Sequence, residues 1–231
     1  MVSHFGILKE LFDRQVEYQK TLDPSFFNEF LKKQKPFITM VTCSDSRVQP
    51  EVFGINPINN IFSVRNIGNQ IINSLGSVDY GVNHLKTPLL IILGHVRCGA
   101  ITSALQGYEN ETFATIRELN NLCFPIGEVR KKSFKRFHDM VEEAVLENIH
   151  YQVDLALKRY RQRVESGELT VVGALYDFAN LYGKGKGRVL IVNLNGLRSK
   201  EEILQRVKEE ERDLWREFLD EFFVSKGWEE K

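Results

Sequence analysis

The sequence predicts an α/β fold in which a mostly parallel central β-sheet is flanked by helices. Five short apolar runs rich in β-branched residues alternate with segments of helical periodicity. Runs that are apolar on both faces are typical of strands buried in a parallel sheet with helices on each side. No internal repeat, low-complexity block or linker interrupts the chain, so the order of elements favours a single domain over residues 1–231.

The first 35 residues are predicted to form an N-terminal helical arm, residues 1–35. From Phe5 to Val16, apolar side chains recur at the spacing of an amphipathic helix. Asp23 is followed by a proline, the order expected of an N-cap and the first helical position. A second helix is therefore predicted from there to about Lys33.

The strands of the sheet are predicted at residues 37–42, 61–64, 89–93, 171–175 and 189–192. Between them, the spacing of apolar residues predicts a helix over 77–86 and a long helix over about 137–164. Residues 107–136 are less regular, and the glycine–lysine segment 183–187 predicts a flexible turn that lacks the serine or threonine of a phosphate loop. Residues 200–231 are predicted as a C-terminal helix rich in Glu, Arg and Leu.

The composition argues against several classes of partner. Thirty-one basic residues balance 31 acidic ones, which gives no reason to expect a nucleic acid or a membrane surface. The N-terminal segment carries charges throughout and resembles neither a signal peptide nor a membrane span. Three cysteines are too few and odd in number for a disulfide framework, so metal binding or catalysis in a reducing compartment is favoured. We expect a cytoplasmic protein.

Two short clusters carry the chemistry. Cys43 follows the first predicted strand, and His95 and Cys98 follow the third. Two thiolates and one imidazole suit zinc, and three protein ligands leave the fourth tetrahedral position open, as in catalytic sites. Gly94 and Gly99 permit close approach of the backbone on both sides. The sequence therefore predicts one zinc ion per chain, held by Cys43, His95 and Cys98.

The cysteines allow two other interpretations. A cysteine at the end of a strand, such as Cys43, is most often a small buried hydrophobic residue. Cys123 could also supply a fourth ligand and close the site as a structural Cys₃His centre, although it lies away from any predicted strand end.

Asp45 and Arg47 lie within a few residues of Cys43. In an extended segment, residues i and i+2 point the same way. Arg47 is then expected to hold Asp45 by a bidentate contact and to keep it ionised, which suits Asp45 to orient a metal-bound hydroxide. The alternative is a plain surface ion pair, which contributes little.

The ordered set of these motifs resembles the β-class carbonic anhydrases. The resemblance rests on C-x-D-x-R at residues 43–47 and H-x-x-C at 95–98, and extends through segments 64–69 and 76–80. It is strong over about residues 30–110. It implies four parallel strands with one antiparallel edge strand, and a homodimer or dimer-based higher oligomer in which N-terminal helices embrace a second chain.

The resemblance also implies the activity, which is the zinc-dependent, reversible hydration of carbon dioxide to bicarbonate and a proton. Zinc-bound hydroxide would attack carbon dioxide, with Asp45 and Arg47 as the catalytic pair that orients it. An apolar pocket suits carbon dioxide, which has no charge and no donor. The implied substrate-binding residues are Gln34, which would hydrogen-bond the substrate, and Phe62, Ile67, Tyr80 and Gly99.

Three further residues bear on this expectation. His84 lies one helical turn after Tyr80 and is a candidate proton shuttle, because histidine titrates near neutral pH; a packed or solvent-facing histidine is the alternative. Met40 stands where some bacterial members have a tryptophan that helps to hold a regulatory bicarbonate, with an arginine that Arg65 matches here. We therefore expect no such bicarbonate site.

Two rival functions remain open from the sequence alone. Hydrolysis of carbon disulfide or carbonyl sulfide needs the same site chemistry and differs only in the access of the gas to the metal. A non-catalytic zinc-binding module needs four protein ligands, for which Cys123 is the candidate.

Overall fold

The computed structural model describes residues 4–225. The chain forms two compact units, 1–35 and 36–231, and the first corresponds to the predicted arm. The first unit holds α1 (His4–Thr21), which is the predicted amphipathic helix, and a 3₁₀ turn, η1 (Asn28–Phe30). The second predicted helix is wrong. The Asp23 side chain accepts hydrogen bonds from Ser25 N–H and Oγ at 2.7 and 2.6 Å, which makes a local turn in place of a helix start.

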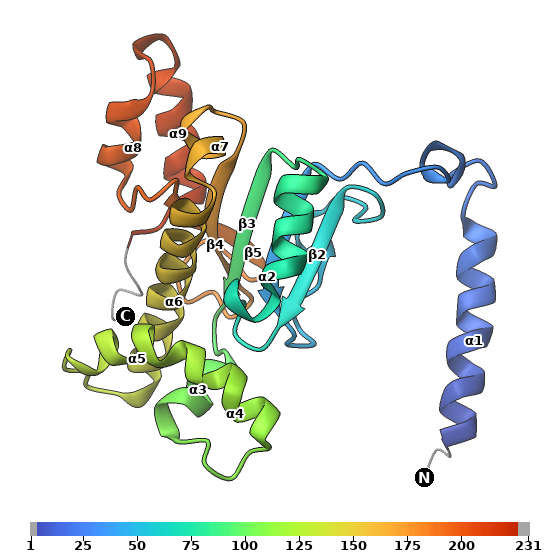
Figure 1. The fold of residues 1–231 in the computed structure, drawn as a ribbon, viewed down its shortest axis with the longest axis horizontal. Coiled ribbons are helices and arrows are strands. Elements are labelled where there is room, and N and C mark those ends of the chain that lie inside the picture. Colours follow the sequence, from blue (N-terminus) through green and yellow to red (C-terminus); the bar gives the residue numbers. More distant parts are fainter. Residues whose placement is uncertain (1–3, 226–231) are drawn as a thin grey trace. The chain divides into compact units, whose positions relative to one another are not determined.

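The second unit is built on a five-stranded sheet in the order β2-β1-β3-β4-β5, and the predicted fold class is confirmed (Figure 1). The first four strands of that order are parallel, and β5 is the antiparallel edge strand. The strands are β1 (Ile38–Cys43), β2 (Ile61–Asn66), β3 (Leu89–His95), β4 (Thr170–Asp177) and β5 (Arg188–Leu194).

The helical segments differ from the predicted ones in four places. The predicted long helix over 137–164 is interrupted at Tyr160, so that one helix ends at Arg159 and another begins at Arg161. Residues 107–136 are largely helical, and the segment 77–86 divides into a short α-helix and a π-helical turn. The predicted C-terminal helix breaks where Val207 is extended, at φ −84° and ψ 142°. The segments are η2 (Pro50–Phe53), η3 (Ile72–Ser74), α2 (Leu75–Asp79), η4 (Tyr80–His84), α3 (Gly99–Gln106), α4 (Phe113–Leu119), η5 (Asn120–Leu122), α5 (Cys123–Arg130), α6 (Phe137–Arg159), α7 (Arg161–Glu165), α8 (Lys200–Arg206), η6 (Glu209–Glu211) and α9 (Arg212–Phe222).

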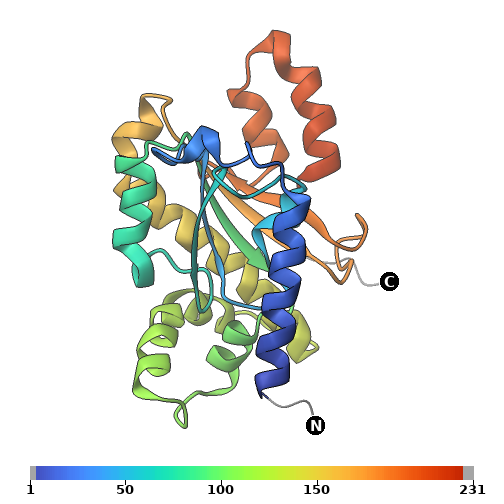
Figure 2. The same ribbon diagram turned by 90° about the vertical axis from the view of Figure 1, so that its right-hand side faces the viewer.

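The two faces of the sheet are covered differently. On one face, Val41 and Leu90 pack against Val78 of α2 and Val153 of α6. On the other face, η2 and its neighbour Val48 cover the middle strands, and α8 and α9 pack against β5. Both views show α3, α4 and α5 gathered at one end of the sheet and α8 and α9 toward the other (Figure 1 and Figure 2). None of the helices in the described part of the chain is long and apolar enough to cross a bilayer.

Candidate metal centre

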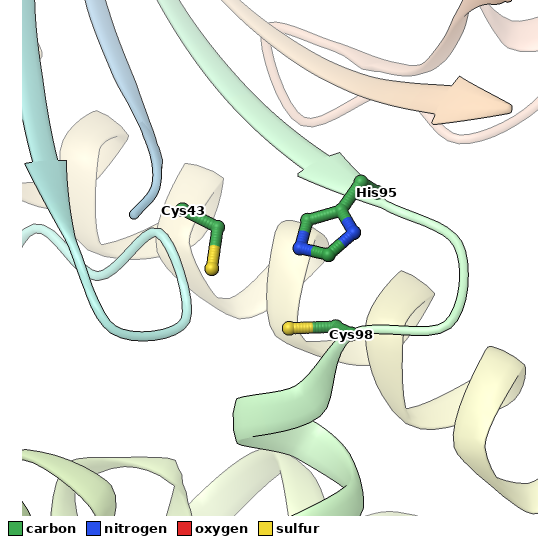
Figure 3. A group of neighbouring side chains, drawn as sticks. All are labelled: Cys43, His95 and Cys98. Atoms are coloured by element: carbon green, nitrogen blue, oxygen red, sulfur yellow. The ribbon is translucent and has the colours of Figure 1, made fainter. Parts of the chain in front are cut away.

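Three potential metal ligands meet at the carboxyl edge of the sheet. Cys43 is the last residue of β1, His95 is the last residue of β3, and Cys98 lies just before α3. All three side chains are buried, and their ligand atoms lie within 4.8 Å of one another (Figure 3). Because β1 and β3 are parallel neighbours, their carboxyl ends lie side by side, so two motifs far apart in the sequence form one cluster.

The orientation of the His95 ring favours a metal at this point. Its Nδ1 lies 2.9 Å from the Val96 carbonyl oxygen, which can only accept, so Nδ1 of the neutral ring carries the proton. Its Nε2 then offers a lone pair. Within residues 4–225 this buried atom has no hydrogen-bond partner, which is unusual for a buried polar group. A divalent cation between the imidazole and the two sulfurs would satisfy it.

The two thiols titrate as a pair. The hydrogen bond from the Cys98 thiol lowers the pKa of Cys43, and the same contact, together with burial, raises the pKa of Cys98. Backbone N–H groups of Ala100 and Ile101, at the start of α3, donate to the Cys98 sulfur and favour its thiolate. A divalent cation would remove the remaining proton, because thiolate is the form that binds metal.

Asp45 is fixed beside this cluster by Arg47. Arg47 donates from Nε to Oδ1 at 2.9 Å, from Nη2 to Oδ2 at 2.7 Å, and from its backbone N–H to Oδ1 at 3.0 Å. These bonds hold the pKa of Asp45 well below its usual value, with the side-chain hydrogen bond from Arg47 as the largest cause. Oδ2 lies 3.8 Å from His95 Nε2, so an ionised acceptor stands next to the ligand atoms.

The bidentate contact forms for a different reason from the one expected. Residues 45–48 make a turn closed by the Val48 N–H donating to the Asp45 carbonyl at 3.0 Å, and are not extended. Within it, the Asp45 side chain accepts the Arg47 N–H, as in an Asx turn. Arg65 of β2 braces the same segment, donating from Nη2 to the carbonyls of Cys43 and Asp45 at 3.2 and 2.9 Å.

Phe178 completes the surroundings of the cluster and was missed in the sequence. It follows the last residue of β4, and its ring lies under the Arg47 guanidinium at 4.7 Å and beside the His95 ring at 6.2 Å. Its only signal in the sequence is its place three residues after the predicted strand 171–175. Arg47 Nη2 also donates to the Arg97 carbonyl at 3.2 Å, so Arg47 is held from two sides.

The matches with known proteins agree with this geometry. The family model described as carbonic anhydrase matches residues 38–185, which is more than half of the chain. The chain belongs to the carbonic anhydrase family. Carbonic anhydrase 2 of Mycobacterium tuberculosis is 31% identical over 153 residues, covering 62% of this chain and 71% of that protein. Beta carbonic anhydrase 3 of Arabidopsis thaliana is 28% identical over 177 residues, covering 70% and 67%.

Solved structures of β-carbonic anhydrases share the fold. One of the two tetrameric enzymes described from Sordaria macrospora superposes with a TM-score of 0.66 at 23% identity, over 81% of this chain and 96% of that one. The Coccomyxa enzyme, in complex with acetazolamide, also gives 0.66, at 22% identity over 93% and 98%. The family match and the shared fold therefore agree, and this carbonic anhydrase belongs to the β class.

Two of the predicted pocket residues lie next to the cluster in this carbonic anhydrase. Ile67 packs against the apolar group that contains Cys43 and Cys98. Gly99 is the first residue of α3, and a side chain at that position would meet no atom within 4 Å. Cys123, the candidate fourth ligand, is exposed at the start of α5 and lies outside the cluster.

Phe62 and Tyr80, two other predicted pocket residues, lie away from the cluster. Phe62 pairs with Thr39, four positions before Cys43, which places it about 13 Å along the strand from the cluster. Its ring contacts Tyr80 at 5.8 Å, and Tyr80 stacks on His84 at 4.5 Å. Within one chain, this aromatic group is not brought to the metal centre. Gln34 belongs to the separate unit 1–35, and its role stays a prediction.

Proposed function

We propose that this chain hydrates carbon dioxide reversibly to bicarbonate and a proton, with one zinc ion held by Cys43, His95 and Cys98. The observation that carries the proposal is the buried Nε2 of His95, which has no hydrogen-bond partner among residues 4–225 and faces two buried sulfurs. This donor set suits zinc. Three protein ligands leave one tetrahedral position for a water. When bound, zinc supplies a Lewis acid that lowers the pKa of that water toward neutrality.

Asp45 is proposed to orient the attacking oxygen. As an ionised acceptor, Asp45 would take a hydrogen bond from the water oxygen that attacks the substrate and so fix its orientation toward the carbon. Arg47 keeps Asp45 in one orientation and in the ionised form through the three hydrogen bonds between them. By orienting the attacking oxygen, these residues would increase the rate of hydration.

The substrate pocket is proposed to need a second copy of the chain. Ile67 and Gly99 lie beside the cluster of their own chain, whereas Phe62 and Tyr80 lie toward the opposite end of the sheet. The family resemblance assigns all four, with Gln34, to substrate binding, so we infer that a homodimer or a dimer-based higher oligomer brings the two groups together. Exposed apolar side chains on α1, among them Phe5 and Phe12, support such a contact.

His84 is proposed as a proton shuttle within the same assembly. It is exposed and stacks on Tyr80, so a proton accepted there would pass readily to solvent. A solvent-facing histidine without this role is the alternative, and His84→Ala tests it. A shuttle predicts a slower maximal rate that added imidazole buffer restores.

A reducing compartment suits the proposed centre. All three cysteines are free, and two of them must stay reduced to bind metal. We therefore infer a cytoplasmic location, which cell fractionation would test.

The function is tested by stopped-flow carbon dioxide hydration across pH, with zinc quantified on the same sample. We expect one zinc per chain, and loss of both zinc and activity in Cys43→Ser and Cys98→Ser, with Cys123→Ser as the matched control that keeps both. A zinc-free variant with full activity would contradict the metal assignment. Activity toward carbonyl sulfide or carbon disulfide alone would instead favour the rival hydrolase.

A further inference from the structure

Glu142 is a carboxylate buried in the core beside the metal centre. It lies on α6, its side chain is 0% exposed, and it packs within a largely apolar part of that helix. Its Oε1 accepts a hydrogen bond from the Arg97 N–H at 2.9 Å and lies 3.7 Å from His138 Nδ1. Its Oε2 has no partner among the described residues. Acidic residues are rarely buried this completely, so its presence calls for a reason.

The N–H that Glu142 binds lies in the turn between two of the proposed metal ligands. Arg97 lies between His95 and Cys98 and has a φ of 55°. Residues other than glycine rarely adopt this left-handed backbone conformation. Such a conformation persists only where contacts with the surrounding structure stabilise it. Here the Arg97 N–H donates to Glu142 and its carbonyl accepts from Arg47, so both polar backbone groups are held.

We propose that Glu142 is a positioning residue of the metal centre, whose carboxylate binds the Arg97 N–H and fixes the turn that presents His95 and Cys98 to one ion. The inference rests on the proposed zinc site and deepens it. Residues behind the ligands commonly set the geometry of a metal site, although they touch neither metal nor substrate.

The buried charge works against folding, which makes a purely structural role a poor explanation. Burial raises the pKa of Glu142 to about 7, the effect expected when a carboxylate loses water without full compensation. Arg97 favours ionisation of Glu142 through its N–H and its charge, and Asp177 opposes it. His138 Nδ1 lies 3.7 Å from the same carboxylate. An apolar residue of similar length would fill the same space at lower cost.

Three substitutions separate the hydrogen bond from the charge and from the volume. Glu142→Gln keeps an oxygen acceptor without the charge, Glu142→Met keeps the length without an acceptor, and Glu142→Asp keeps the charge but withdraws it by one methylene. Glu143→Met is the matched control, because Glu143 is the next residue of α6 and pairs with Lys132. We would measure the rate of zinc transfer to a chelator and the spectrum of the cobalt-substituted protein.

Glu142→Met is expected to release zinc about 10–100-fold faster than wild type and to change the cobalt spectrum. Glu142→Gln should remain near wild type, and the metal-free Glu142→Met protein should melt no lower than metal-free wild type. Zinc release from Glu142→Met at the wild-type rate would overturn the proposal, as would an equal loss of melting temperature with and without metal. If Glu142→Met does not fold, the same comparison on Glu142→Asp decides.

The same experiment also distinguishes a wrong function from a wrong role for Glu142, because carbon dioxide hydration and zinc release are measured separately. A wild-type protein that holds zinc but hydrates no carbon dioxide would contradict the function, while the comparison of release rates still decides the role of Glu142. A wild-type protein that holds no zinc at its ligands would overturn both.

Discussion

Asp45 owes its charge and its orientation to one neighbour. Arg47 presents two parallel donors to its two oxygens, a geometry that lysine cannot reproduce and that an asparagine at position 45 could satisfy only in part. The amide nitrogen of an asparagine would face a guanidinium donor. A change at this position therefore affects orientation without touching the three proposed ligands.

Asp45→Asn is expected to keep one zinc per chain and to lower kcat by roughly 100-fold, the size of effect seen when one oriented hydrogen-bonding group is removed. Stopped-flow hydration and zinc content on one sample measure both. Glu128→Gln, which removes an exposed carboxylate paired with Lys131, is the control. Wild-type turnover in Asp45→Asn would remove Asp45 from the mechanism.

Phe178 is expected to act through Arg47. A cation over an aromatic ring contributes about 0.5–2 kcal/mol, so loss of the ring should let Arg47 and with it Asp45 move. We predict that Phe178→Leu lowers kcat by roughly 3–10-fold with zinc content unchanged, and that Phe178→Tyr, which keeps the ring face, stays near wild type. Equal rates for the leucine and tyrosine variants would argue against the stacking.

The proposed ligands could be predicted from the sequence because Cys43 and His95 lie at the ends of recognisable strands and Cys98 follows His95 by three residues. Phe178 and Glu142 could not, since their contacts join segments that no local pattern connects: Glu142 meets the Arg97 N–H across 45 residues of sequence. The turn at Asp45 was also beyond the pattern, because two serines allow an extended segment equally well.

Strands β3 and β4 approach α6 closely, and glycine makes this possible. A Cβ at Gly94 would lie 2.6 Å from Ile149 Cδ1, and one at Gly173 would lie 2.8 Å from Ile149 Cγ2. Ile149 of α6 is therefore seated over two glycines, one of which precedes His95. Glycine at position 94 sets the distance between the helix and the strand that carries a proposed ligand.

Gly94→Ala is expected to lower the free energy of unfolding by about 1–3 kcal/mol, the usual cost of overpacking a filled core. Urea unfolding measures it. Gly76→Ala in α2 is the matched control, because a Cβ there meets nothing within 4 Å and alanine favours a helix by about 0.5–1 kcal/mol. Equal stabilities of the two variants would show that Ile149 shifts without strain.

At the scale of elements, the strands were the most predictable, including β2, which is only partly buried. All five strands were located because their runs are apolar, whereas α4 and α5 carry exposed aromatic residues, Phe113 and Phe124, that hide the helical period. The chain breaks between α8 and α9 at Val207, which is neither glycine nor proline. The residue type at this position therefore does not indicate the break.

At the scale of the whole molecule, the two groups of predicted pocket residues lie toward opposite ends of one sheet. The ligands, Ile67 and Gly99 gather at the carboxyl edge, while Phe62 lies four positions back along its strand. A single chain therefore does not enclose the pocket that the family resemblance implies. The proposed activity should depend on assembly.

Leu11 and Phe12 of α1 are 58% and 69% exposed, and a double substitution to glutamate should weaken the proposed contact between chains. We expect a smaller species in sedimentation and a lower kcat at equal zinc content. Glu10→Gln on the same helix is the control. An unchanged mass would place the contact between chains elsewhere.

The parallel pairing of β1 with β3 also sets the order of events as the chain folds. His95 and Cys98 are close in the sequence and can meet a metal in an unstructured chain, but Cys43 joins them only after Thr42 is in register with Leu93. Complete coordination therefore waits for a long-range crossover, which is a slow step in folding. Metal uptake during refolding should report the moment at which the two central strands pair, and an excess of zinc present too early should delay that moment by holding the local pair of ligands.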